Sequence, residues 1–226
     1  MAMPIPSPLE PKSVTSYLLS VLEASDQTPY IGEPISQLQH SLQAAHQAAS
    51  ASPPADEATQ VAALLHDIGQ FVPGRDLISL TGGRAENLGG AATGESVGRV
   101  GHDTLGGAFL LALGFSAKVA RLVASHVEAK RYLCAVDSGY YGKLSDASRK
   151  SLAYQGGPMR GKELADFGGD PWCGEMCRLR VWDDEAKVQG LQSEPRPELG
   201  LVAGLAIVSM PSREKFDMTT MVHNDQ

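Results

Sequence analysis

Leu64-Leu65-His66-Asp67-Ile68-Gly69 places a histidine and an aspartate side by side at the end of an apolar pattern with helical spacing. Asp56 is the expected N-cap of that helix, and Gly69 is expected to end it. Adjacent helix residues point about 100° apart, so an imidazole can bind one ion while the carboxylate beside it reaches between two. The pair therefore indicates a metal site built on the end of a helix.

Three further histidines fall on predicted helices whose other faces are apolar, namely His40, His102 and His126. A lone histidine on an apolar face is most often a hydrogen-bonded core residue. Four histidines together with Asp67 favour a metal centre instead, because neutral imidazole is a common metal ligand. Asp183, on a later helix, adds a second carboxylate. Six such ligands would serve two ions and leave positions open, which is typical of catalytic sites.

The remaining elements are predicted from capping residues and apolar spacing. Helices are expected to begin near Ser13, Pro34, His102, Ser116, Ser145 and Asp170-Pro171, and the one capped by Ser116 to run through Val127. Residues 72–100 contain seven glycines and are expected to form a long loop. Strand-like alternation is weak throughout the chain. The sequence therefore predicts an all-α helical bundle.

Composition sets the broad class of protein. The 226 residues are 42% hydrophobic and 20% charged, as in an ordinary globular protein, so we expect one domain over residues 12–211 with tails at 1–11 and 212–226. A net charge of -7 argues against nucleic acid or an anionic membrane as partner. No apolar run reaches the ~20 residues of a membrane span. The oligomeric state stays open.

The three cysteines, Cys134, Cys173 and Cys177, are too few and odd in number for a disulfide framework, which favours a cytoplasmic protein. Cys173 and Cys177 stand four residues apart but lack two further ligands for a zinc site. We interpret them as small buried hydrophobic residues.

The His66-Asp67 pair resembles the signature of the HD-domain superfamily, which is named after it. Further segments resemble the PhnZ-type mixed-valent diiron oxygenases, which oxidatively cleave the carbon-phosphorus bond of 2-amino-1-hydroxyethylphosphonate. These segments are Tyr30-Ile31-Gly32-Glu33, Gly101-His102, the stretch from His126 to Leu133, and Gln155-Gly156-Gly157-Pro158. The resemblance spans roughly residues 30–187, most of the chain, and implies an HD-domain helical bundle.

The resemblance also implies two iron ions, one ferrous and one ferric, with dioxygen as co-substrate and a small anionic organic molecule as substrate. The implied iron ligands are the six residues already singled out, with Asp67 as the bridge.

Lys130, one turn after His126, is implied to meet the phosphonate, and Ser148, Gln155 and Arg180 to contact its oxygens. Tyr30 and Glu33 match the pair that covers the open iron and contacts the substrate amine. Gln70 stands where the family often has a histidine, so this contact to the substrate differs from the family pattern.

Several alternatives stay open at this point. An HD phosphohydrolase would use one or two divalent ions to hydrolyse a phosphate ester without dioxygen. A polyol oxygenase of the inositol-oxygenase kind and a non-catalytic binding module are further possibilities. Lys130 could be a solvated helix lysine, and Glu33 a charge at a helix N-terminus. Arg180 could form a structural ion pair with Asp183 or Asp184.

Overall fold

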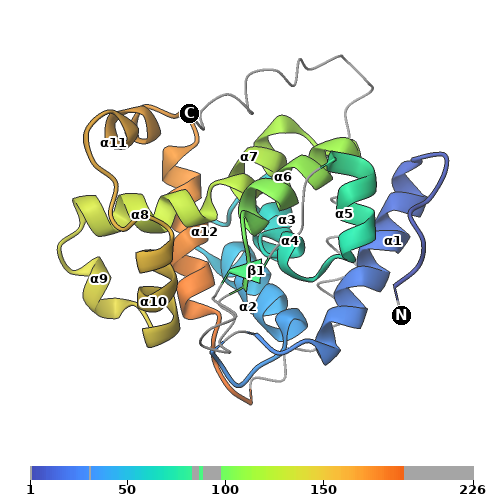
Figure 1. Ribbon diagram of the computed structural model, residues 1–226, viewed down its shortest axis with the longest axis horizontal. Coiled ribbons are helices and arrows are strands. Elements are labelled where there is room, and N and C mark those ends of the chain that lie inside the picture. The colour runs from blue at the N-terminus through green and yellow to red at the C-terminus, as the bar shows by residue number, and fades with distance from the viewer. Residues whose placement is uncertain (1, 31, 83–86, 89–97, 191–226) are drawn as a thin grey trace.

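The computed structural model describes residues 2–30, 32–82, 87–88 and 98–190, and these are almost entirely helical (Figure 1). The helices are α1 (Pro11–Ala24), the 3-10 helix η1 (Ser25–Gln27), α2 (Gln37–Ser50), α3 (Glu57–Leu65), α4 (Ile68–Phe71), α5 (Gly74–Thr81), α6 (His102–Ala112), α7 (Ala117–Ala124), α8 (His126–Val136), α9 (Tyr140–Lys143), α10 (Asp146–Tyr154), α11 (Gly161–Gly168) and α12 (Cys173–Glu185). Strands β1 (Asn87–Leu88) and β2 (Gly98–Arg99) form one short antiparallel pair. The predicted all-α class is confirmed.

Helix α12 packs against α2, α3 and α8, while α6 packs against α4, α5 and α7 (Figure 1). The helices bury one main apolar cluster, to which α1, α3, α6 and α7 contribute most of the large side chains. Helices α9 and α10 enclose a smaller cluster around Tyr140, Leu144 and Leu152. In the described part of the chain, no helix has the length and apolar character needed to cross a membrane.

Side-chain caps at helix starts were predicted well. Asp56, Ser116 and Ser145 each accept a hydrogen bond from the backbone N–H three residues later, as expected for N-caps. The second helix begins later than predicted, at Gln37 rather than near Pro34. Ser36 forms a reciprocal capping box with Gln39, and this pair fixes the helix start more strongly than the proline does.

The loop predicted over residues 72–100 is wrong in its first part, because Gly74–Thr81 form α5. This helix buries Leu77 completely, and its Asp76 accepts a hydrogen bond of 2.9 Å from the buried Tyr17 hydroxyl. Such a long-range contact is invisible in a glycine-rich local sequence. The rest of the predicted loop at 83–86 and 89–97, and the predicted tail at 212–226, lie outside the described residues.

Two predicted helices are interrupted next to the candidate ligands. Helix α3 ends at Leu65, so Gly69 does not end it, and the His66-Asp67 pair occupies the junction with α4. The helix capped by Ser116 breaks at Ser125, after which α8 begins at His126.

The last helix begins at Cys173, two residues beyond the predicted proline start. Asp170 Oδ1 instead accepts a hydrogen bond from the Trp172 N–H in a preceding turn.

Gly69 allows α4 and α6 to touch through their backbones. A β-carbon on Gly69 would lie 1.9 Å from the carbonyl oxygen of His102 and 3.0 Å from the backbone nitrogen of Gly106. A contact of 1.9 Å is impossible, and backbone atoms cannot rotate away as a flexible side chain can. The absent side chain therefore sets the distance between the His66-Asp67 junction and the start of α6.

We expect Gly69→Ala to lower the free energy of unfolding by about 3 kcal/mol or more, above the usual range for overpacking, because the backbones of α4 and α6 must separate. Gly174→Ala is the matched control, since a β-carbon there has no neighbour within 4 Å. Urea unfolding of both variants checks this. Equal midpoints for Gly69→Ala and the parent would show that the two helices do not need this contact.

Candidate metal centre and substrate cavity

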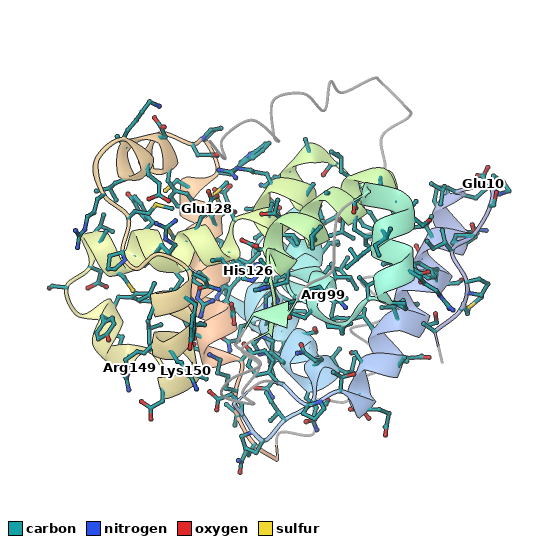
Figure 2. The ribbon with its side chains drawn as sticks, viewed as in Figure 1. Glu10, Arg99, His126, Glu128, Arg149 and Lys150 are labelled. Carbon is teal, nitrogen blue, oxygen red and sulfur yellow. The ribbon has the colours of Figure 1, made fainter. Side chains whose placement is uncertain are left out.

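The six predicted ligands come together from five parts of the fold. His40 lies on α2, His66 and Asp67 at the junction of α3 and α4, His102 and His126 at the first positions of α6 and α8, and Asp183 on α12. All six are buried. Figure 2 places His126 near the middle of the molecule, whereas Arg149 lies at its edge.

Local backbone geometry explains why the ligands stand at helix ends. Gly101, in the left-handed region at φ 62°, lets the chain turn sharply so that His102 opens α6. The break at Ser125 does the same for His126 at the start of α8. A helix N-terminus carries partial positive charge, which disfavours protonated imidazole and so favours the neutral form that binds metals.

The backbone fixes the tautomer of all four imidazoles. Each Nδ1 lies 2.8–3.0 Å from a carbonyl oxygen, on Ala186 for His40, Ala63 for His66, Arg99 for His102 and Val123 for His126. Only a protonated Nδ1 can donate these bonds, so in the neutral rings Nε2 carries a lone pair. This arrangement is the one that supports and orients metal-binding histidines.

The Nε2 atoms meet in two pairs. His40 and His66 form one pair and His102 and His126 the other, with 3.0 Å between the two nitrogens in each. Two lone pairs that face each other at this distance repel unless a cation or proton lies between them. Two nitrogens bound to one ion at about 2.1 Å and at right angles lie about 3.0 Å apart. The histidine pairs therefore fit metal ions.

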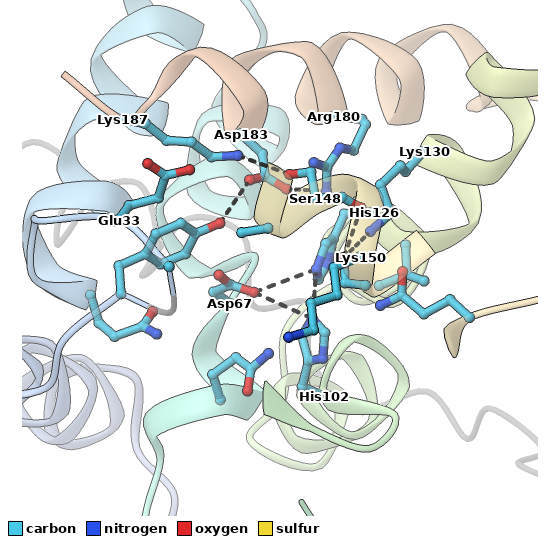
Figure 3. A pocket seen from close by; sticks show the side chains of 18 of the residues that line it. Glu33, Asp67, His102, His126, Lys130, Ser148, Lys150, Arg180, Asp183 and Lys187 are labelled. Atoms are coloured by element: carbon cyan, nitrogen blue, oxygen red, sulfur yellow. Dashed lines mark hydrogen bonds and ion pairs between the residues drawn. The ribbon is translucent and has the colours of Figure 1, made fainter. Parts of the chain in front are cut away.

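Asp67 stands between the two pairs and offers one oxygen to each. Its Oδ2 lies 3.8 and 3.7 Å from the Nε2 atoms of His40 and His66, and its Oδ1 lies 3.5 and 3.4 Å from those of His102 and His126. Figure 3 shows the carboxylate beside His102 and His126. The two groups of possible ligands that share Asp67 could each hold one ion.

Asp183 makes the two candidate sites unequal. Its Oδ1 lies 3.3 Å from His40 Nε2 and 3.8 Å from His66 Nε2, so the first site has four possible ligands and the second three. The Tyr30 ring stacks on His40 with 3.9 Å between ring centres, and its hydroxyl lies 3.4 Å from Asp183 Oδ1. Tyr30 therefore covers the first site from the cavity side.

The electrostatics of the site suit metal ligands. Burial lowers the pKa of His66 to about 4 and also lowers that of His102, which keeps both rings neutral. Burial alone would raise the pKa of Asp67, yet His66 and the contact with His126 hold it below its ordinary value. His126 differs, since its contact with Asp67 outweighs burial and raises its pKa. An ion at this site must displace that proton.

A cavity of about 460 Å³ opens beside Asp67, His102 and His126 (Figure 3). All the predicted substrate contacts line it, namely Tyr30, Glu33, Gln70, Lys130, Ser148, Gln155 and Arg180. Gln155 Oε1 and Gln37 Oε1 at this cavity are buried acceptors with no hydrogen-bond partner in the described residues. Such atoms call for water or a ligand with donors.

Lys130 is buried rather than solvated, with 2% of its surface exposed. Its Nζ donates to Ser151 Oγ at 2.7 Å, and burial lowers its pKa to about 7, with the positive charge of Arg180 as a further cause. A lysine held in such a place is costly for stability, so a role in binding an anion is favoured.

Arg180 forms the ion pair that the sequence left open. It donates to Asp183 Oδ2 at 2.6 Å and to both oxygens of Asp184, and Tyr140 completes this buried group. Arg180 lowers the pKa of Asp183, although burial alone would raise it. The guanidinium thus fixes the carboxylate that faces His40 and His66.

Gln70 is fixed by the short strand β2, because its Oε1 accepts a 2.7 Å hydrogen bond from the Arg99 backbone N–H. No local sequence pattern indicates this contact across 29 residues. Further polar residues that line the cavity were not predicted from the sequence, among them Lys150, Ser151 and Lys187. The spacing of Lys187, four residues after Asp183, could have indicated it.

Cys173 and Cys177 are free thiols that lie half-buried against the main apolar cluster. Among the described residues, no possible metal-binding group includes a cysteine.

The HD-domain family model matches residues 38–154. The chain belongs to the HD-domain family. It is 38% identical to a Gimesia maris protein named hydroxymethylphosphonate dioxygenase, over 79% of this chain and 80% of that protein. A Leisingera caerulea protein named 1-hydroxy-2-(trimethylamino)ethyl phosphonate dioxygenase (glycine-betaine-forming) is 32% identical over 83% and 87%. An uncharacterized protein of Acanthamoeba polyphaga mimivirus is 31% identical over 79% and 74%.

Because Asp67 is shared by both candidate sites and each histidine belongs to one, substitutions of these residues should remove different numbers of ions. Asp67→Ala should lose both ions because it serves both histidine pairs, whereas His102→Ala should lose the second ion and keep the first. His46→Ala is the control, since this histidine on α2 belongs to neither pair. Metal analysis after dialysis checks the stoichiometry. Two ions retained by Asp67→Ala would contradict the shared carboxylate.

Proposed function

We propose that this chain is an iron-dependent oxygenase that uses dioxygen to cleave the carbon-phosphorus bond of a small 1-hydroxyphosphonate. The supporting observation is a carboxylate shared by two histidine pairs at the wall of a cavity that also holds a buried lysine. Two relatives named as dioxygenases of hydroxylated phosphonates support the substrate class. The free thiols fit a reducing compartment such as the cytoplasm.

The reaction balances without a further reductant. One 1-hydroxyphosphonate and one dioxygen give one carboxylic acid and one phosphate. The hydroxyl-bearing carbon loses its hydrogen, its bond to phosphorus breaks, and both oxygen atoms are retained in the products. A ferrous and a ferric ion held by the six ligands would supply dioxygen activation and the redox change.

The protein's own side chains bind and orient the substrate. The Lys130 ammonium faces the cavity, and a phosphonate dianion beside it raises the pKa of this lysine, so that it is charged in the complex. Ser148 and Ser151, one turn apart on α10, can donate their hydroxyls to phosphonate oxygens. This end of the cavity would hold the head group and direct the hydroxyl-bearing carbon toward Asp67.

Tyr30 and Glu33 control the other part of the site in this proposal. Tyr30 lies between the cavity and the first histidine pair, so moving its hydroxyl away from Asp183 would uncover an ion for substrate or dioxygen. Glu33 lines the cavity and can accept a hydrogen bond from a substituent on the substrate.

Phosphate release from 1-hydroxyphosphonates tests the reaction class directly. Iron-loaded protein should release phosphate from hydroxymethylphosphonate or its 2-amino and 2-trimethylammonio ethyl analogues, with one dioxygen consumed per phosphate. Under anaerobic conditions release should stop. Release that continues without dioxygen, or with manganese or magnesium in place of iron, would instead indicate the hydrolase alternative.

Lys130→Met should lower kcat/KM by roughly 30-fold to several-thousand-fold, because a charge-assisted contact of about 2–5 kcal/mol is lost. Metal content should not change, since Lys130 is not among the ligand groups. Phosphate release at several substrate concentrations measures the effect. A variant that matches the parent would remove Lys130 from the substrate site.

Lys130→Met should also raise the free energy of unfolding, by about 1–3 kcal/mol near pH 6, because a buried charge is removed. The folded-state pKa of Lys130, about 7, lies below the ordinary 10.5, so the folded protein carries a penalty that is complete below pH 7. This penalty fades as the pH rises toward 10.5, and the gain in stability should fade with it. Thermal melting at several pH values checks this, and a gain independent of pH would contradict the charged lysine as its cause.

A further inference from the structure

Lys187 lines the cavity but belongs to none of the roles described above. It follows the end of α12, and its side chain is only 11% exposed. Its Nζ donates to Ser148 Oγ at 3.2 Å and lies 5.9 Å from the centre of the Tyr30 ring. Figure 3 shows the Lys187 ammonium directed toward Ser148. A lysine placed this way faces the cavity rather than the bulk solvent.

The backbone on both sides of Lys187 is tied to α2. His40 Nδ1 donates to the carbonyl oxygen of Ala186 at 2.8 Å. The buried Gln43 closes a double hydrogen bond with Val188, donating to its oxygen and accepting from its nitrogen at 3.0 Å each. These bonds hold an irregular segment in place, and they fix the direction of the one side chain between them before any ligand arrives.

A phosphonate dianion carries two negative charges, and Lys130 can pair with one of them. Arg180 is already paired with Asp183 and Asp184, because it donates hydrogen bonds to both carboxylates. Lys187 has a looser contact with Asp184, at 3.6 Å. Beside the metal ions that the proposed function places at the histidine pairs, a second ammonium group at the head group would help to balance the charge of a buried dianion.

The two lysines approach the same face of α10. Lys130 ends at Ser151 and Lys187 at Ser148, and residues three apart on a helix have β-carbons about 5–6 Å apart. A tetrahedral anion at this face of α10 could therefore contact both ammonium groups and both hydroxyls. Burial and the charge of Arg180 lower the pKa of Lys130, and the charge of Lys187 contributes to the same shift. The two ammonium groups therefore act on one another across the cavity.

We propose that Lys187 is the second cation of the phosphonate-binding site, which it forms with Lys130 and the two serines of α10, while Arg180 acts on Asp183. This inference rests on the proposed function. In this proposal Lys187, which lies beyond the end of α12, pairs with the negative charge of the phosphonate. Gln43 is then a positioning residue that acts through Lys187.

Binding of methylphosphonate to the metal-loaded protein tests this, because the ligand lacks the hydroxyl and cannot react. Lys187→Met should raise its Kd about ten- to a hundredfold, as expected for one charge-assisted contact. Lys187→Arg should recover most of the affinity. Lys162→Met is the control, since it removes one positive charge on α11 that pairs with Asp166 outside the cavity.

Two further readouts separate binding from a structural role. Lys187→Met should retain two ions and raise KM for 1-hydroxyphosphonates more than it lowers kcat. Gln43→Met keeps the lysine but removes its fixed backbone, and it should raise the Kd by a smaller factor. If Lys187→Met does not fold, Lys187→Gln with the same measurement of methylphosphonate binding replaces it.

An unchanged Kd in Lys187→Met, or a loss of metal together with affinity, would overturn the proposal. So would a parent protein that binds no methylphosphonate. A parent that binds methylphosphonate through Lys187 but releases no phosphate from any 1-hydroxyphosphonate would leave this anion site standing and refute the proposed reaction.

Discussion

In each of two histidine pairs, the Nε2 lone pairs point at each other across 3.0 Å. The rest of the site depends on how the repulsion between these lone pairs is relieved. The backbone carbonyls that hold the Nδ1 protons prevent the rings from escaping by a change of tautomer. Burial lowers the pKa of His66 and of His102, which opposes relief by protonation there. A cation within each pair relieves the repulsion, and Asp67 supplies negative charge to both places.

The fold serves this centre by bringing helix ends, rather than helix middles, to one point. A helix end places a side chain at a sharp change of backbone direction, so neighbouring residues such as His66 and Asp67 can diverge. Gly69 lets α4 approach the start of α6, and Gly101 turns the chain into that helix. On the opposite wall, Arg180 holds Asp183 in position, and this leaves the lysines to face the cavity.

The sequence predicted the ligands more readily than the geometry that presents them. Histidines on apolar faces are detectable because burial of a polar ring needs a reason, and this identified His40, His102 and His126 correctly as buried neighbours of Asp67. Helix α5 was missed because its stability comes from Leu77 in the core and from the Tyr17–Asp76 hydrogen bond across 59 residues. The break at Ser125 was missed because apolar spacing continues through it. The spacing of Lys187 from Asp183 could have indicated its place at the cavity, but the direction of its side chain depends on contacts with α2 and α10, which no local pattern encodes.

Anomalous diffraction at the iron absorption edge, from crystals of protein loaded with iron without oxygen, tests the two-ion centre most directly. Two peaks about 3.5–4 Å apart are expected, one next to His40 and His66 and the other next to His102 and His126, with the Asp67 carboxylate between them. A single peak, or two peaks that Asp67 does not bridge, would contradict the shared carboxylate and the function built on it.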